Sequence, residues 1–307
     1  MAQLINTFSW SLSRQQMFDE CRRQYYLNYY RSWGGWDDRA DPAARLAYRL
    51  KQIVSPEMWV GDILHRLIES QLARLRQGYR PLPNPLRERA RSLLNTEWRQ
   101  SADKRWRENP KHNRNLFEHY YGIEISDQRR AELRDRLFAC LDHFCQLPLL
   151  ERLAVADPKA WLAVEQLDTF VVDRVPVFVK IDCAARLDGR TLIIDWKSGR
   201  AAQRDNDQIA CYGLYAMQKW NLGVETVRAL LVYLLSNETA EKTVPPEQAL
   251  AIQEKIVSGI AAMRDSLADR VANVAREDDF PMTDQKRRCR RCNFHEICYG
   301  PGPIPEE

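Results

Sequence analysis

Residues 177–200, VFVKIDCAARLDGRTLIIDWKSGR, decide the fold of this chain. Two runs rich in Val and Ile flank the pair Asp188-Gly189, and an Asp-Gly pair between two such runs is typical of a β-hairpin. Asp182 ends the first predicted strand, and Asp195 lies near the end of the second. Because side chains alternate across a strand, Asp195 and Lys197 share one face. The hairpin therefore predicts two carboxylates and one ammonium group that converge at the strand ends.

This group of side chains suits phosphodiester hydrolysis. Carboxylates hold Mg²⁺ or Mn²⁺ through hard oxygen ligands, and such a metal lowers the pKa of a bound water and offsets charge on the scissile phosphate. Lys197 would position the attacking water or stabilise the pentavalent phosphorane. An Asp-x-Lys sequence alone is common by chance, so its weight comes from the hairpin that joins it to Asp182. Glu165, on the preceding predicted strand, either joins the site or faces the solvent.

The flanking sequence predicts a mixed α/β core. Strands are expected at 161–166, 168–172, 175–184, 191–196 and 226–235, and helices at 11–32, 57–76, 126–147, 205–220 and 246–275. Between the second and third helices lies a polar, Arg-rich helical segment, 78–115. We expect one nuclease domain over 1–307, with an N-terminal helix in 1–56, a basic helical insertion at 70–150, a catalytic core at 157–275 and a Cys-rich tail at 280–307.

The order Asp182, hairpin, Asp195-x-Lys197 resembles the motif of the PD-(D/E)XK nucleases, whose restriction-endonuclease-like core is a mixed sheet flanked by helices. Over residues 57–235 the chain is similar to the RecB-like branch of that superfamily. Its Gly-x-x-x-His motif matches Gly61 to His65, and its Gln-x-x-x-Tyr motif matches Gln208 to Tyr212. The chain departs from the family at Val179, where Gly is frequent, and at Cys183, where Arg is frequent.

The resemblance implies roles for these residues. Asp182, Asp195 and His65 would bind Mg²⁺ or Mn²⁺, and Gln208 and Tyr212 would complete the catalytic site and contact DNA. Taken singly, a His on an apolar helix is more often a core residue, and Gln and Tyr four positions apart are ordinary helix neighbours. A further element, Asp195-Trp-Lys-Ser-Gly199, is similar to the family's Asp-Tyr-Lys-Thr-Gly. Four such elements in the family's order favour the functional interpretation.

The C-terminal segment holds a metal-binding pattern of its own, Cys289-Arg-Arg-Cys292 followed by Cys298. Three thiolates leave one position open on a soft metal centre, and Cys21 is the candidate for the fourth. Its surroundings, Ser11-Leu-Ser13 followed by Cys21-Arg-Arg-Gln-Tyr-Tyr, resemble the iron–sulfur RecB-like nucleases, among them the AddB subunit and the CRISPR-adaptation exonucleases. The resemblance implies a [4Fe–4S] cluster. Four thiolates also suit Zn²⁺, and His295 can replace one of them.

Bulk composition limits the class of protein. The chain of 307 residues is 45% hydrophobic and 29% charged, as in ordinary globular proteins. No apolar run reaches about 18 residues, so we expect no membrane span. The first residues lack the pattern of a signal peptide, which predicts a cytoplasmic location. Disulfides are rare in that compartment, so the eight cysteines are expected to be buried thiols, metal ligands or nucleophiles.

The positive charge is concentrated in one block. Residues 74–114 hold twelve Lys and Arg against four Asp and Glu, an excess of +8 in a chain of net charge +4. Tyr79, Trp98 and Trp106 lie among them, as on a surface that binds a polyanion with stackable bases. The alternative is a solvated helix face. On the first interpretation the residues expected to bind nucleic acid are Arg87, Arg91, Arg99 and Arg105.

The sequence thus predicts a metal-dependent DNA nuclease. The resemblance favours an exonuclease acting on single strands or ends in DNA repair, recombination or antiviral defence. Two alternatives stay open: an endonuclease subunit of a defence or repair complex, and a catalytically silent DNA-binding module. The sequence has no G-x-x-x-x-G-K-[ST] motif, so any unwinding would need a separate helicase partner.

Overall fold

The computed structural model describes residues 4–200 and 204–302, and the chain divides into two compact units. The first unit comprises Met1–Pro56, Asn95–Ser126 and Ser258–Glu307, and the second comprises Glu57–Leu94 and Asp127–Val257. Residues of the expected insertion, 70–150, belong partly to each unit. The single domain and its expected subdivisions stay predictions, and the last five residues of the expected tail lie outside the described residues.

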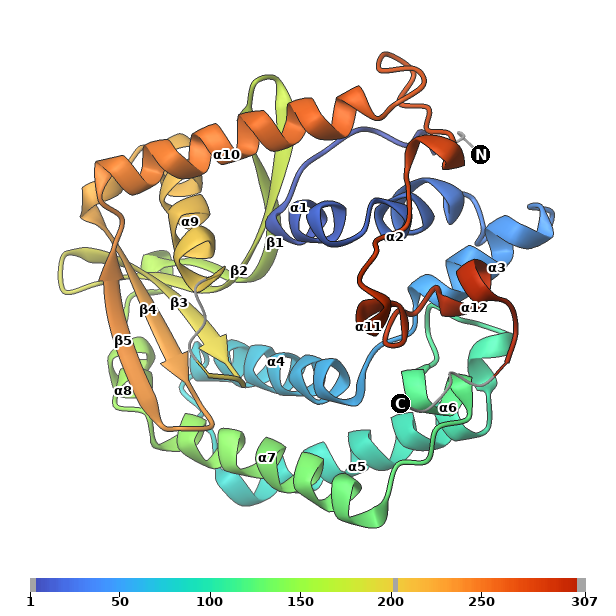
Figure 1. The fold of residues 1–307 in the computed structure, drawn as a ribbon. Helices are drawn as coiled ribbons and strands as arrows, with labels where there is room; N and C mark the ends of the chain where they lie inside the picture. Colours follow the sequence, from blue (N-terminus) through green and yellow to red (C-terminus); the bar gives the residue numbers. More distant parts are fainter. Residues whose placement is uncertain (1–3, 201–203, 303–307) are drawn as a thin grey trace. The chain divides into compact units, whose positions relative to one another are not determined.

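The second unit is built on a five-stranded mixed sheet with the order β1-β2-β3-β4-β5 (Figure 1). Three of its four pairings are antiparallel, and β3 pairs with β4 in parallel. Parallel neighbours need a crossover connection, which helix α9 (Arg204–Trp220) supplies. The predicted mixed α/β core is therefore confirmed. The strands are β1 (Trp161–Val172), β2 (Val175–Leu187), β3 (Arg190–Lys197), β4 (Val227–Tyr233) and β5 (Glu238–Thr243).

The hairpin between β2 and β3 forms as the sequence predicts. Leu187 pairs with Arg190, so Asp188 and Gly189 alone make the turn, with φ of 53° and 73°. Positive φ at both central residues is the geometry that matches the twist of a hairpin. The two strands expected at 161–166 and 168–172 are one strand, β1. Strand β5 was not predicted from the sequence, because ETAEKT is polar and its residues are largely exposed.

Helices cover both faces of the sheet within the second unit. Tyr212 and Tyr215 of α9 are buried, whereas Trp196 of β3 points to the opposite side and meets the ring of Phe144 edge-on at 5.5 Å. The expected helices at 57–76, 126–147 and 205–220 are confirmed. The helical elements of this unit are α4 (Pro56–Leu75), α7 (Asp127–Gln146), α8 (Leu149–Ala154), α9, η3 (Pro158–Ala160) and η4 (Val224–Thr226). Two further helices, α5 (Pro83–Ala102) and α10 (Pro246–Asp265), have residues in both units.

The first unit is helical, and its N-terminal part packs against its C-terminal part. Phe280 stacks on Tyr26 at 5.5 Å, and Arg23 donates through Nε to the carbonyl of Phe280 at 2.8 Å. The helix expected over 11–32 is interrupted at Cys21, which is extended, with φ −163° and ψ 110°. The elements are α1 (Leu12–Glu20), α2 (Arg22–Tyr26), η1 (Leu27–Arg31), α3 (Pro42–Lys51), η2 (Arg105–Arg107), α6 (Phe117–Tyr121), η5 (Glu277–Asp279), α11 (Lys286–Cys289) and α12 (His295–Tyr299).

Two expectations from the sequence concern long helices, one for residues 246–275 and one for membrane spans. The helix expected over 246–275 ends at Asp265. Of the helices in the described ranges, none has both the length and the apolar character that crossing a bilayer requires.

Candidate active site

Three carboxylates form a row across neighbouring strands of the second unit. The flanking pairs Val164–Cys183 and Gln166–Ile181 place Glu165 of β1 opposite Asp182 of β2. The pair Cys183–Ile194 places Asp195 of β3 on the other side of Asp182. The side chains of Glu165, Asp182 and Asp195 are only 3%, 8% and 4% exposed. Carboxylates with so little solvent exposure repel one another strongly unless cations compensate their charge.

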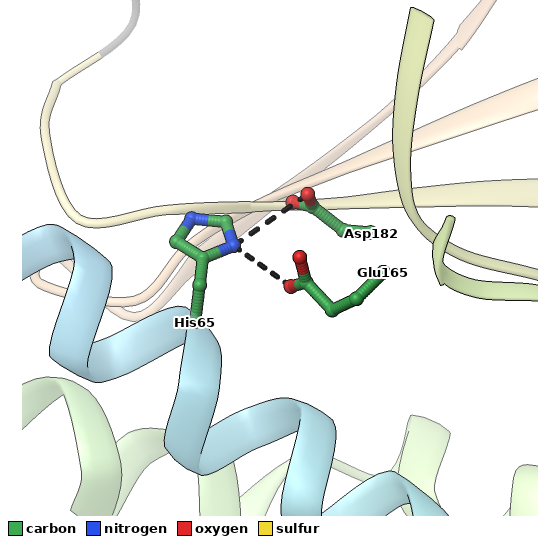
Figure 2. A group of neighbouring side chains, drawn as sticks. All are labelled: His65, Glu165 and Asp182. Atoms are coloured by element: carbon green, nitrogen blue, oxygen red, sulfur yellow. Dashed lines mark hydrogen bonds and ion pairs between the residues drawn. The ribbon is translucent and has the colours of Figure 1, made fainter. Parts of the chain in front are cut away.

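His65 of α4 completes a metal-binding group with two of these carboxylates (Figure 2). Its Nδ1 atom lies 3.1 Å from Oε1 of Glu165 and 3.5 Å from Oδ1 of Asp182. One ligand atom from each of the three residues lies within 4.8 Å of the other two. Two carboxylate oxygens and one imidazole nitrogen fit a divalent cation such as Mn²⁺. Glu165, which the sequence left open, is therefore part of this group, with its backbone at φ 45°.

The two carboxylate oxygens of Asp195 have different surroundings. Its Oδ1 atom accepts hydrogen bonds from Gln208 Nε2 at 2.8 Å and from the Tyr212 hydroxyl at 2.9 Å. Its Oδ2 atom is buried and accepts no properly oriented hydrogen bond from the described residues, although Lys197 Nζ lies 2.7 Å away. A buried carboxylate oxygen in this state suits a metal ligand. The structure thus brings the predicted His65 and Asp182 into one group and places the predicted Asp195 on the strand next to Asp182.

Lys197 is fixed by groups from β3 and α9. Its Nζ donates to Oε1 of Gln208 at 2.7 Å and lies 3.5 Å from Oδ1 of Asp205. Asp205 is buried and accepts a hydrogen bond from the hydroxyl of Tyr233 at 3.0 Å. Asp205 was missed in the sequence, yet its position three residues before Gln208 puts it on the same face of α9. The predicted Gln208 and Tyr212 therefore orient the carboxylate and the ammonium group of the motif.

The electrostatics of the group favour the binding of a cation. Burial and the neighbouring Asp195 raise the pKa of Asp182 to about 7. Burial lowers the pKa of His65, but the hydrogen bond to Glu165 and the charges of Asp182 and Glu165 outweigh it, so the net shift is upward. Burial raises the pKa of Glu165, and the contacts with His65 and Lys180 reverse this to a net lowering. A bound divalent cation would offset the burial and the repulsion by Asp195 that raise the pKa of Asp182.

A comparison with protein-family models shows the family of the chain. The model of the PD-(D/E)XK nuclease superfamily matches residues 9–299, nearly the whole chain. The chain belongs to the PD-(D/E)XK nuclease superfamily. No curated protein matches the chain. The resemblance noted on Asp182, Asp195 and Lys197 is confirmed at the level of the superfamily.

The raised pKa of Asp182 makes metal binding to this PD-(D/E)XK chain depend on pH. Below about pH 7 the metal-free protein carries a proton on Asp182, which the cation must displace. We expect Mn²⁺ affinity, measured by calorimetry, to rise at least tenfold between pH 5.5 and pH 7.5 and to level off above. Because the folded pKa exceeds the unfolded one, the stability of the metal-free protein should fall over the same interval.

The control for this prediction is Asp182→Asn, which keeps the shape of the side chain and cannot ionise. In this variant both the affinity for Mn²⁺ and its dependence on pH should decrease. A wild-type affinity that stays constant from pH 5.5 to pH 7.5 would contradict the assignment of Asp182 as a ligand with a raised pKa.

Most of the arginines expected to bind nucleic acid face carboxylates. Arg87 pairs with Asp142, Arg91 with Glu88, and Arg105 lies 3.6 Å from Asp103. Arg99 is exposed. Exposed ion pairs are weak, and phosphate can displace them. The DNA-binding role of these four arginines stays a prediction.

The four cysteines of the second predicted metal site all belong to the first unit. Cys21 lies at the break between α1 and α2, Cys289 ends α11, and Cys298 lies in α12. Burial raises the pKa of Cys292 to about 12, and the nearby thiols of Cys298, Cys21 and Cys289 contribute to the rise. The four thiols are therefore close enough to interact electrostatically. His295 turns its Nδ1 to the carbonyl of Cys289 at 3.0 Å.

The remaining cysteines show no such grouping with one another. Cys140, Cys183 and Cys211 are buried and Cys145 is partly buried, and burial is the main cause that raises the pKa of each thiol. These thiols behave as small core side chains.

Proposed function

We propose that this chain is a Mg²⁺- or Mn²⁺-dependent deoxyribonuclease of the RecB-like branch. The observation that carries the proposal is the placement of His65, Glu165 and Asp182 within 4.8 Å of one another, on strands next to Asp195 and Lys197. Membership in a superfamily of nucleases makes a phosphodiester of DNA the substrate. The motifs from Gly61 to His65 and from Gln208 to Tyr212 support the RecB-like branch.

Each residue of the site has its own role in the proposed reaction. His65, Glu165, Asp182 and Asp195 would hold the divalent cation, which supplies a water of lowered pKa and offsets charge on the scissile phosphate. Lys197 accepts no metal itself; its ammonium group donates to Gln208 and forms an ion pair with Oδ2 of Asp195. From there it orients the attacking water and stabilises negative charge on the phosphorane. Tyr212 and Gln208 keep Asp195 in place through its other oxygen.

The direct test is digestion of end-labelled linear DNA without divalent metal, with Mg²⁺ and with Mn²⁺. A nuclease of this kind degrades the DNA only when metal is present. Complete inactivity with both metals would instead favour the catalytically silent DNA-binding module.

The mode of cleavage is tested with a covalently closed single-stranded circle. An exonuclease acts from an end, so we expect linear single-stranded DNA to be degraded and a circle of the same sequence to be spared at least a hundredfold. A circle nicked once beforehand serves as the control and should be degraded like the linear strand. Rapid cutting of the closed circle would support the alternative, an endonuclease subunit of a defence or repair complex.

We also infer that Cys21, Cys289, Cys292 and Cys298 bind a [4Fe–4S] cluster. Tetrahedral zinc holds its thiolates about 3.8 Å apart, as the Zn–S bond length dictates. Among the described residues, His65, Glu165 and Asp182 form the group of candidate metal ligands that lie within 4.8 Å of one another. The four thiols are not part of such a group. The resemblance of the Cys21 segment to the iron–sulfur RecB-like nucleases supports the cluster. Zn²⁺ is the alternative that metal analysis would reveal.

The biological role is proposed from the resemblance, and the location from the sequence pattern. We place the protein in the cytoplasm, in DNA repair, recombination or antiviral defence. A separate helicase or defence complex would supply unwound DNA, since the chain has no nucleotide-binding P-loop sequence.

A further inference from the structure

A second candidate site lies in the first unit, among residues that the catalytic group does not use. A cavity of about 540 Å³ is lined by the cations Arg49, Lys104 and Arg107, with Trp106, Tyr120 and Glu296 around them. This volume is ample for a phosphate with its sugar. All of these residues belong to the first unit, whereas the carboxylate row belongs to the second.

The three cations differ from the other basic residues of the block around them. Arg80, Arg87, Arg91, Arg105 and Arg114 each lie within 4.0 Å of a carboxylate oxygen. For Arg49, Lys104 and Arg107 the part of the chain that the structure describes offers no ion pair. Three cations that form no ion pair with the described residues repel one another around one cavity, and an anionic ligand would relieve that repulsion.

An aromatic side chain orients two of these cations. The Cζ atoms of Arg49 and Arg107 lie 5.9 Å and 5.6 Å from the centre of the Trp106 ring. Trp106 is 3% exposed, and its Nε1 donates to the carbonyl of Ser101 at 3.3 Å, so the ring is a fixed support. A cation–π contact holds a guanidinium group without using its N–H donors. Those donors stay available for the oxygens of a ligand.

Glu296, the carboxylate among the residues that line the cavity, already has a hydrogen-bond partner in the same lining. Oε2 of Glu296 accepts a hydrogen bond from the hydroxyl of Tyr120 at 2.6 Å. Glu296 lies between Cys292 and Cys298 in the sequence, so the wall of the cavity is part of the Cys-rich segment. The lining therefore has three cations against one carboxylate.

We propose that this cavity binds a phosphate group of a nucleic-acid strand, as a strand-holding site that is separate from the catalytic residues. Arg49 and Arg107 offer planar guanidinium forks that match phosphate oxygens, and Lys104 adds a mobile ammonium group. The identity of the ligand rests on the proposed nuclease function. The phosphate is either the 5′-terminal phosphate or an internal phosphodiester of the strand.

The test compares the binding of fluorescent single-stranded oligonucleotides, with and without a 5′-phosphate, by anisotropy in the absence of divalent metal. The variant Lys104→Gln/Arg107→Gln removes two charges at exposed positions. We expect its affinity to fall on the order of tenfold. The slope of log K against log salt should flatten by about 1.4, which is 0.7 for each lost phosphate contact of a single strand. The matched control Arg80→Gln/Arg152→Gln removes two charges that carboxylates already face, and its slope should change less.

The outcomes separate this proposal from the proposed function. A loss confined to the 5′-phosphorylated oligonucleotide identifies the terminal phosphate, and a loss with both identifies an internal phosphodiester. If the wild type cleaves DNA and the variant binds both oligonucleotides with wild-type affinity and slope, the cavity proposal alone is overturned. If the wild type cleaves no DNA, the proposed function fails whatever the binding shows. Thermal unfolding checks the fold of the variant, and Arg107→Gln alone, with half the change in slope, replaces it if the double variant unfolds.

Discussion

Asp195→Ala is expected to reduce the rate of metal-dependent DNA cleavage on the order of a thousandfold or more. The substitution removes the buried oxygen that would bind the cation and the carboxylate beside Lys197 Nζ. The fold should persist, because the change also removes repulsion from Asp182, whose pKa Asp195 helps to raise. DNA binding should persist as well, since phosphate contacts elsewhere carry most of the affinity. The rate is measured on end-labelled linear DNA with Mn²⁺.

Lys197→Ala should give a loss of similar size for a different reason. The ammonium group that orients the water is lost, while the metal ligands stay, so Mn²⁺ affinity should change far less than in Asp195→Ala. The ion pair between Asp207 and Lys255, 2.7 Å long, provides matched controls near the site. Asp207→Ala and Lys255→Ala remove the same two kinds of charge and should cleave at wild-type rates. Wild-type cleavage by Asp195→Ala would refute this active site.

The part of the site that depends on local geometry could be predicted from the sequence. The turn at Asp188-Gly189 fixes the register of β2 and β3, and the register places Asp182 beside Asp195. Gln208 follows in the crossover helix that a parallel β3–β4 pair requires. Hairpin turns and helix periodicity act over a few residues, and a single sequence contains them.

Contacts between distant segments could not be predicted in that way. His65 lies a hundred residues from Glu165, and only the resemblance to RecB-like nucleases indicated it. The position of Glu165 depends on the register of β1, which shifts between Trp161 and Ala163. It also depends on a positive φ at Glu165 itself, which the sequence does not indicate because the residue is not a glycine. The pairing of Arg87 with Asp142 joins two helices, so charge counting overestimated how much of the basic block is unpaired.

The division of the chain into two units could not be predicted from the sequence either. Asn95–Ser126 belongs with the termini of the chain, yet α5 runs without a break from Pro83 to Ala102, and no Gly, Pro or polar linker marks the boundary at Leu94. The helix break at Cys21 was missed for a related reason. The apolar spacing continues through it, while the backbone there adopts the extended conformation that sets the thiol at the start of α2.

Replacing any one of Cys21, Cys289, Cys292 and Cys298 by Ser is expected to remove the metal centre of the first unit. Anaerobically purified wild type should be brown and hold about four irons per chain, as a [4Fe–4S] cluster with four thiolates requires. A ligand set that joins residue 21 to residue 298 closes almost the whole chain, so metal binding is linked to folding. Each variant should therefore bleach and unfold at a lower temperature than the wild type, as followed by visible absorbance and thermal melting.

The matched control is Cys140→Ser, which changes a buried thiol of the second unit and should keep both colour and iron. The loss of stability in the four variants should remain partial, because the stacking of Phe280 on Tyr26 and the hydrogen bond from Arg23 still join the two ends of the first unit. Stoichiometric zinc without iron in the anaerobic protein would overturn the cluster and leave a zinc site on the same thiols. Full colour in Cys21→Ser would show instead that the three C-terminal thiolates recruit another fourth ligand, and that the N-terminal segment is held by its aromatic contacts alone.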